Sequence, residues 1–116
     1  MALQHANSGE VIDLRPLGES LAGSKSHAIV RTPHFEAMRL VIPAGSEIPT
    51  HEVDGPVMVH CIEGCVRIGL GQDAPTLRAG HWLYLEGGES YSFLGVEDAS
   101  LLMTILFGSP RGEGAA

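Results

Sequence analysis

The sequence predicts an all-β fold, a small barrel of two antiparallel sheets. Short apolar runs recur about every ten residues, a spacing typical of sandwiches and barrels. The segments between the runs carry glycine and proline, which supply the backbone angles that tight turns need. No long stretch shows the period of an amphipathic helix.

The expected strands follow one another along the chain. Pro33 separates two of them, and the run 101–107 is continuous enough to indicate a buried strand after a turn rather than a helix. Turns are expected at the glycines and prolines between the runs. The predicted strands are 11–14, 27–32, 35–42, 57–62, 65–70, 76–78, 82–85, 91–94 and 101–107.

The length of 116 residues is enough for one domain with one modest core, which we expect within about residues 27–107. Apolar residues make up 44% of the chain, which favours a packed core over disorder. Residues 1–10 and 108–116 are polar or rich in glycine, and we expect them to be loose ends.

Charge and hydropathy narrow the range of partners. The net charge is −7, and the seven Lys and Arg residues are scattered, so neither a nucleic-acid groove nor binding to an anionic membrane is expected. No apolar run is long enough to span a membrane, and residues 1–10 do not resemble a secretory signal. A cytoplasmic location is therefore expected, with Cys61 and Cys65 as free thiols.

Two glycine-anchored stretches carry the most specific pattern in the chain. They are residues 45–64 and residues 80–93. Their spacing resembles the paired motifs of the cupin family. The resemblance covers about residues 35–107 and implies a single-domain jelly-roll barrel, also described as a double-stranded β-helix.

The first stretch keeps the family's glycines but not most of its metal ligands. Gly45 and Gly64 stand at the two glycine positions, and His51 stands at the first histidine position. Val53 occupies the position of the second histidine, and Val57 that of the glutamate. One of the three ligands that the resemblance implies for this motif is thus present.

The second stretch departs from the family in the same way. Gly80 and Gly88 match the family's glycines, whereas Glu86 replaces a proline. Tyr91 stands at the position of the fourth ligand, a histidine, and Gly95 at that of an asparagine.

This replacement of ligands argues against a family-type metal site. A first-row divalent ion generally needs three or more protein donors, and valine has no donor atom. His51 and the phenol of Tyr91 supply two. The alternative is a relocated site in which His51 joins His60, His81 or Tyr91, with Glu86 as a further donor, around Fe, Mn, Ni or Zn.

We therefore expect the barrel mouth to bind a small molecule without a metal ion. Strand alternation points Val57, Val59 and Cys61 inward and His60 outward. His51 could instead be a rim histidine, Tyr91 a core side chain, and Cys61 a small buried hydrophobe. The candidate ligand-binding residues are His51, Tyr91, Val53, Val57, Phe93 and Cys61.

Each of four further residues has two or more possible roles. Glu86 is either a catalytic base or, more simply, a charged residue in a surface loop. Arg39 is either inward, paired with an anionic ligand, or outward and solvated. Trp82 and Tyr84 share one strand face that lines a cavity, belongs to the core or forms a subunit interface.

Three functions follow in order of preference. The first is a small-molecule-binding barrel, working as a homodimer and without an identified catalytic residue. The second is a metal-dependent enzyme of the dioxygenase or isomerase type, built around His51. The third is a structural or regulatory module with a filled barrel. Serine-nucleophile elbows and phosphate-binding glycine loops are absent from the sequence.

Overall fold

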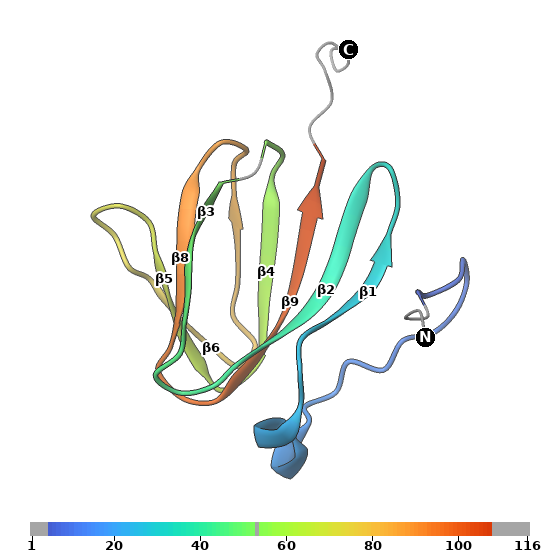
Figure 1. Ribbon diagram of the computed structural model, residues 1–116, viewed down its shortest axis with the longest axis horizontal. Helices are drawn as coiled ribbons and strands as arrows, with labels where there is room; N and C mark the ends of the chain where they lie inside the picture. Colours follow the sequence, from blue (N-terminus) through green and yellow to red (C-terminus); the bar gives the residue numbers. More distant parts are fainter. Residues whose placement is uncertain (1–4, 53, 108–116) are drawn as a thin grey trace.

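The computed structural model describes residues 5–52 and 54–107, and for residues 50–52 the backbone alone. In this part of the chain, one short 3-10 helix precedes nine strands (Figure 1). The elements are η1 (Gly18–Gly23), β1 (His27–Arg31), β2 (Phe35–Ile42), β3 (Glu47–Glu52), β4 (Val57–Glu63), β5 (Cys65–Gly69), β6 (Thr76–Arg78), β7 (Trp82–Leu85), β8 (Ser90–Gly95) and β9 (Ala99–Leu106).

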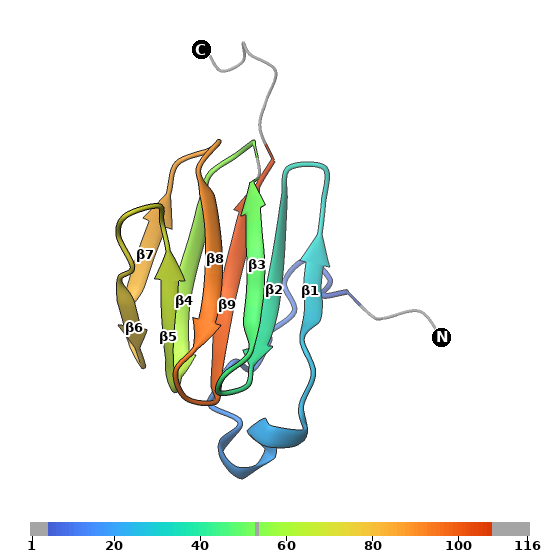
Figure 2. The same ribbon diagram turned by 60° about the vertical axis from the view of Figure 1, so that its left-hand side comes forward.

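The strands form two antiparallel sheets that pack face to face, which confirms the predicted all-β architecture. One sheet has the order β1-β2-β9-β4-β7 and the other β3-β8-β5-β6. The chain passes from one sheet to the other after β2, β3, β4, β6, β7 and β8. The connections after β2, β4, β6 and β8 lie at one end, the lower end in Figures 1 and 2. We call this the closed end, and the opposite end, with the loops after β3, β5 and β7, the open end.

Backbone hydrogen bonds extend the β3–β8 pairing into the turn after β2, which links the two sheets at the closed end. The Gly45 N–H donates to the Gly95 carbonyl at 2.8 Å, and the Gly95 N–H donates to the Ser46 carbonyl at 2.9 Å. Gly64 has φ +84°, and a Cβ there would collide with the Asp98 carbonyl. A Cβ on Gly95 would likewise collide with the Pro43 carbonyl. Gly64 and Gly95 therefore let the backbones approach more closely than any larger residue would allow.

The core lies between the inner faces of the sheets. Along β4, Val57, Val59 and Cys61 are buried, whereas Met58 and His60 are more exposed, as the strand alternation predicts. The buried residues of this core are Ile42, Val57, Val59, Cys61, Val66, Ile68, Leu77, Leu85, Tyr91, Phe93, Ala99, Leu101 and Met103.

Arg39, Glu63 and Ser100 form an outer polar cluster on the face of the larger sheet that points away from the core. The Ser100 hydroxyl donates to Glu63 Oε2 at 2.6 Å. Arg39 Nη2 lies 3.4 Å from the same oxygen and donates to the Ser100 hydroxyl at 3.1 Å. Arg39 thus faces outward and is nevertheless buried, with 3% of its surface exposed, which neither alternative from the sequence foresaw.

The chain before β1 covers this cluster. Glu63 accepts hydrogen bonds from the Leu17 and Gly18 N–H groups, at 2.9 and 3.1 Å. Arg39 donates to the Arg15 carbonyl at 2.8 Å. The cluster therefore attaches the N-terminal segment to the sheet by charge-assisted bonds.

The strand predicted at residues 11–14 is wrong. Val11 is 91% exposed, and no strand of the described chain pairs with this segment. Instead, Arg15 bonds to the Asp13 carboxylate through its backbone N–H at 3.0 Å and its Nε at 2.7 Å. Pro16 then removes a backbone donor, which disfavours a strand continuing through it.

The strand β3 escaped prediction because it contains Pro49. Proline is confined to edge strands and bulges, because it cannot donate to a ladder. Here β3 is the edge of the smaller sheet, and its register with β8 shifts between Ile48 and His51, on either side of this proline.

Replacing Gly64 tests the close contact at the closed end. We expect Gly64→Ala to lower the free energy of unfolding by about 3 kcal/mol, because it combines positive φ with a backbone collision. Gly71→Ala is the control, since Gly71 has φ +67° but open space around it, and about 1 kcal/mol is expected. Urea unfolding measures both, and equal losses would contradict the proposed collision.

Glu63 links stability to pH. Burial acts to raise its pKa, but the hydrogen bonds that it accepts, first that from the Leu17 N–H, and the charge of Arg39 outweigh burial and lower the pKa. This carboxylate therefore stabilises the fold above its unfolded pKa of about 4.3, and that contribution is lost as the pH falls through the lowered folded pKa.

We accordingly expect Glu63→Gln to cost about 3 kcal/mol at neutral pH, since it leaves the buried Arg39 without its anion. The variant should also lose less stability than the wild type below about pH 4.3. Glu97→Gln, in an exposed turn, is the control. Urea unfolding at several pH values measures the effect, and parallel profiles for wild type and Glu63→Gln would disprove the linkage.

Candidate functional site

An apolar cavity of about 160 Å³ lies between the two sheets. Tyr91, Phe93 and Met103 are buried in its wall, whereas its other side chains are partly exposed, so the cavity reaches solvent. It is lined by Met38 and Leu40 of β2, Ile48 of β3, Tyr91 and Phe93 of β8, and Met103 and Ile105 of β9.

Strand alternation explains why these side chains meet. Residues two apart on a strand share a face, which brings Met38 with Leu40, and Met103 with Ile105, to the inner side of the larger sheet. Met38 and Met103 are direct partners in the register of β2 and β9. On the opposite sheet, Ile48 is the register partner of Phe93.

Two aromatic rings form the wall contributed by β8. The ring centroids of Tyr91 and Phe93 are 5.6 Å apart, and the rings are tilted by 55°. Burial raises the pKa of the Tyr91 phenol, so this side chain is neutral at physiological pH. Among the described side chains that line the cavity, its hydroxyl is the one hydrogen-bonding group.

The residues proposed from the sequence for the barrel mouth divide into three groups. Tyr91 and Phe93 line the cavity, as stated above. Val57 and Cys61 belong to the packed core and do not line it. Val53 lies outside the described residues, and so does the side chain of His51, although the His51 backbone is the register partner of Tyr91.

The other candidate metal ligands do not face this cavity. His60 lies on the outer face of β4, between Leu102 and Trp82 in the register of the sheet. His81 lies in the β6–β7 connection at the closed end, where its Nδ1 accepts a hydrogen bond from the Arg78 N–H at 3.0 Å.

A metal site of the family's kind is therefore not formed by the side chains that the structure describes. Among them, no group of three or more His, Cys, Asp or Glu residues lies close enough to hold an ion. Tyr91 is the one sequence-proposed donor in this described set that lines the cavity, and one phenol does not compete with water for a divalent ion.

Cys61 has the environment of a structural cysteine rather than a nucleophile. Its side chain is fully buried, and its thiol lies 3.5 Å from the Glu63 carbonyl. Burial, followed by the neighbouring Cys65, raises the pKa of the Cys61 thiol to about 11. The thiol is therefore protonated at neutral pH, and reactivity requires the thiolate.

The remaining candidates lie on the outside. Trp82 and Tyr84 are 58% and 52% exposed, so they belong neither to the core nor to the cavity. Glu86 is exposed in the loop after β7 and accepts a hydrogen bond from the Tyr84 hydroxyl at 3.5 Å.

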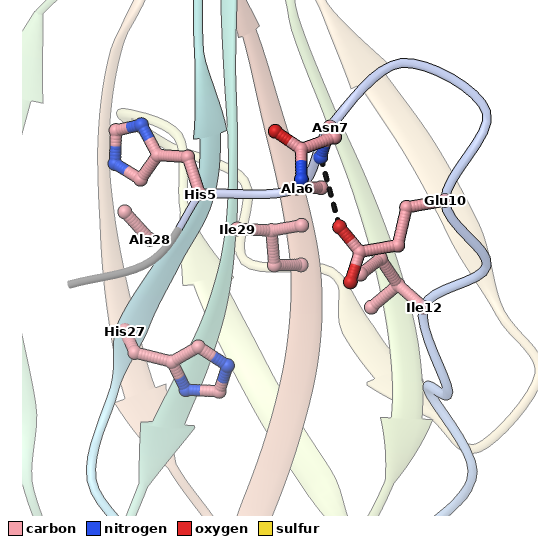
Figure 3. A pocket seen from close by; sticks show the side chains of 8 residues that line it. All are labelled: His5, Ala6, Asn7, Glu10, Ile12, His27, Ala28 and Ile29. Carbon is pink, nitrogen blue, oxygen red and sulfur yellow. Dashed lines mark hydrogen bonds between the residues drawn. The ribbon is translucent and has the colours of Figure 1, made fainter.

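A second hollow lies between the N-terminal segment and β1, but it brings no catalytic group together. The Ala6 N–H donates to the Ile29 carbonyl at 2.8 Å, so part of the stretch expected to be loose is attached to β1. The hollow has about 160 Å³ and includes His5, His27 and Glu10. Figure 3 shows the two imidazole rings pointing in different directions and Glu10 at the opposite side of the hollow.

Sequence reasoning missed most of the cavity wall. Met38 and Phe93 were candidates for a cavity wall because they lie on apolar strands, and both line it. The signal for Leu40, Met103 and Ile105 was also present, because each lies on the inward face of a predicted strand. Which inward faces touch and which leave a space depends on the separation of the sheets, and that separation is not encoded in strand alternation.

In the described part of the chain, no helix has the length and apolar character needed to cross a membrane.

The comparisons with known proteins identify the class of fold. No family model and no curated protein matches the sequence. Among solved structures, a cupin superfamily protein from Desulfitobacterium hafniense is 14% identical, with a TM-score of 0.72 over 84% of this chain and 95% of that protein. A conserved protein of unknown function from Streptococcus pyogenes is 18% identical, with a TM-score of 0.72 over 94% and 99%.

An RmlC-like cupin from Shewanella frigidimarina is 16% identical, with a TM-score of 0.68 over 93% of this chain and 95% of that protein. The chain therefore has the cupin fold, as the spacing of its glycines predicted. At these identities the likeness concerns the fold, and the function must be argued from the site.

Proposed function

We propose that this cupin-fold chain binds a small molecule between its two sheets and that it does so without a metal ion. The observation that carries the proposal is the apolar cavity beside Tyr91 and Phe93, which reaches solvent through partly exposed side chains. Ligand sites in small barrels are mostly apolar, with few polar groups to orient the ligand. The Tyr91 hydroxyl is suited to that orienting role.

The cavity also favours this proposal over a purely structural role. A structural or regulatory module was expected to have a barrel filled by its own side chains. The described side chains instead leave a space of about 160 Å³, which is large enough for a small ring. Free, buried Cys61 and Cys65 support the further proposal of a cytoplasmic location.

The alternative is a metal-dependent enzyme of the dioxygenase or isomerase type. The observation that favours it is the backbone register, in which His51 stands directly opposite Tyr91. In that alternative, His51 and Tyr91 would hold Fe, Mn, Ni or Zn together with further donors. His60 and His81 do not help, because they lie on the outer face and at the closed end.

Mass spectrometry of protein purified without chelator tests the function. We expect a bound small molecule and no stoichiometric transition metal. Tyr91→Phe should weaken ligand binding about threefold to tenfold, the worth of one hydrogen bond, without unfolding the protein. A stoichiometric Fe, Mn, Ni or Zn ion that disappears in His51→Ala would favour the enzyme instead. A stability loss of several kcal/mol in Tyr91→Phe would assign the hydroxyl a structural role.

We also propose that the chain forms a homodimer through an outer patch. In the register of the larger sheet, Leu102, His60 and Trp82 form one row, and Thr104, Met58 and Tyr84 form the next. None of the six carries a formal charge when histidine is neutral. In a two-fold dimer such a patch would meet its own copy, so a chain of net charge −7 could associate there without opposing like charges.

Trp82→Glu tests the dimer. Because it places a charge in the outer patch, we expect it to weaken self-association at least about tenfold, as measured by analytical ultracentrifugation. Thr76→Glu adds the same charge at an exposed position of the other sheet and serves as the control. A monomeric wild type, or equal effects of the two substitutions, would argue against this interface.

A further inference from the structure

We infer that the ligand of the cavity is a neutral molecule with a single aromatic ring, of the benzene or phenol class. This inference rests on the proposed function and narrows it to one chemical class. Three properties of the cavity carry it, namely its size, the nature of its two walls and the position of the surrounding charges.

The size admits one ring. An apolar cavity of about 150 Å³ in another protein binds benzene. The cavity between the two sheets has about 160 Å³. A ring with one small substituent therefore fills it, whereas the second ring of a fused system would extend beyond the lining side chains toward solvent.

The two walls favour a flat ring over an aliphatic chain. Tyr91 and Phe93 present tilted aromatic rings from the smaller sheet. Met38 and Met103, which are paired across β2 and β9, present two thioethers from the larger sheet. Aromatic rings pack edge-to-face with one another, and thioether sulfur makes favourable contacts with aromatic edges. A ligand ring between these walls would gain both kinds of contact.

No described side chain that lines the cavity carries a charge. The guanidinium of Arg39 lies on the other face of β2 and is committed to Glu63. Glu36 shares the inward face of β2 but does not line the cavity, and its carboxylate is 4.0 Å from Arg31. A charge placed among the described lining side chains would therefore find no partner among them, which disfavours an ionic ligand.

The hydroxyl of Tyr91 narrows the class further. Because a phenol oxygen both donates and accepts, it can contact one polar substituent, such as the hydroxyl of a phenol, in addition to its contacts within the protein. The other described lining side chains offer at most a weak thioether acceptor. A ligand ring with one hydroxyl can therefore have its hydrogen bond met in the cavity, whereas a ring with several hydroxyls would leave some without a partner among the described lining side chains.

The test uses two fluorinated phenols of the same skeleton. At neutral pH, 4-fluorophenol is neutral and pentafluorophenol is ionised, and fluorine NMR measures the binding of each to the full chain. We expect 4-fluorophenol to bind at least tenfold more tightly. Equal or tighter binding of the ionised phenol would overturn the inference while leaving small-molecule binding in place.

Two matched substitutions locate the site. Ile105→Phe adds a ring inside the cavity and should weaken 4-fluorophenol binding at least tenfold. Leu94→Phe makes a similar change on the outer face of β8, next to the lining residue Phe93, and should leave binding unchanged. Circular dichroism checks that both variants fold. If Ile105→Phe does not fold, Leu40→Phe replaces it, since Leu40 also lines the cavity.

Failure of this inference is distinguishable from failure of the proposed function. If neither phenol binds but the purified protein carries another small molecule that Ile105→Phe excludes, the ligand class is wrong and the function stands. If neither phenol binds and the protein carries a His51-dependent metal instead, both are wrong. Equal binding to wild type and Ile105→Phe would place the phenol elsewhere and also overturn the inference.

Discussion

Close packing of the backbone turns that link the two sheets at the closed end is the constraint on which the rest of this structure depends. The reciprocal bonds of Gly95 with Gly45 and Ser46 continue the β3–β8 pairing into the turn after β2. Gly64 brings the β4–β5 turn against the Asp98 carbonyl, where a side chain has no room. The turn after β2 leads into β3 and the turn after β8 leads into β9, and these four strands supply the side chains that line the cavity. The turns at the closed end therefore help to position the walls of the cavity.

The outer polar cluster complements this arrangement by keeping charge out of the interior. β2 alternates between Met38 and Leu40, which face the cavity, and Arg39, which faces away. A buried guanidinium needs an anion, and Glu63 at the end of β4 supplies it. The same carboxylate fastens the segment before β1, so one ion pair serves both the sheet and its N-terminal cover. Met38 and Leu40, the residues of β2 that line the cavity, can therefore both be apolar.

Much of the fold, but less of the candidate site, could be predicted from the sequence. The bounds of β2 follow directly from its flanking prolines, and the alternation along β4 correctly placed Cys61 inside and His60 outside. Pro49 concealed β3, because a proline argues against a strand unless the edge position is already known. Arg39 was ambiguous for a similar reason, since only the folded chain reveals which segment covers it. The cavity itself depends on distances between sheets, which no local pattern records.

The replacement of the family's metal ligands and the apolar lining of the cavity have the same consequence, since both disfavour a divalent cation. Val57, at the position of the family's glutamate, is buried in the core and contributes packing where a carboxylate would contribute charge. A divalent ion entering the space beside Tyr91 would lose its hydration shell to side chains such as Phe93 and Met103, which offer no comparable donor. A neutral ring entering the same space gains contact with those side chains and loses little. The chemistry that makes the cavity poor for a cation therefore makes it suitable for an aromatic ligand.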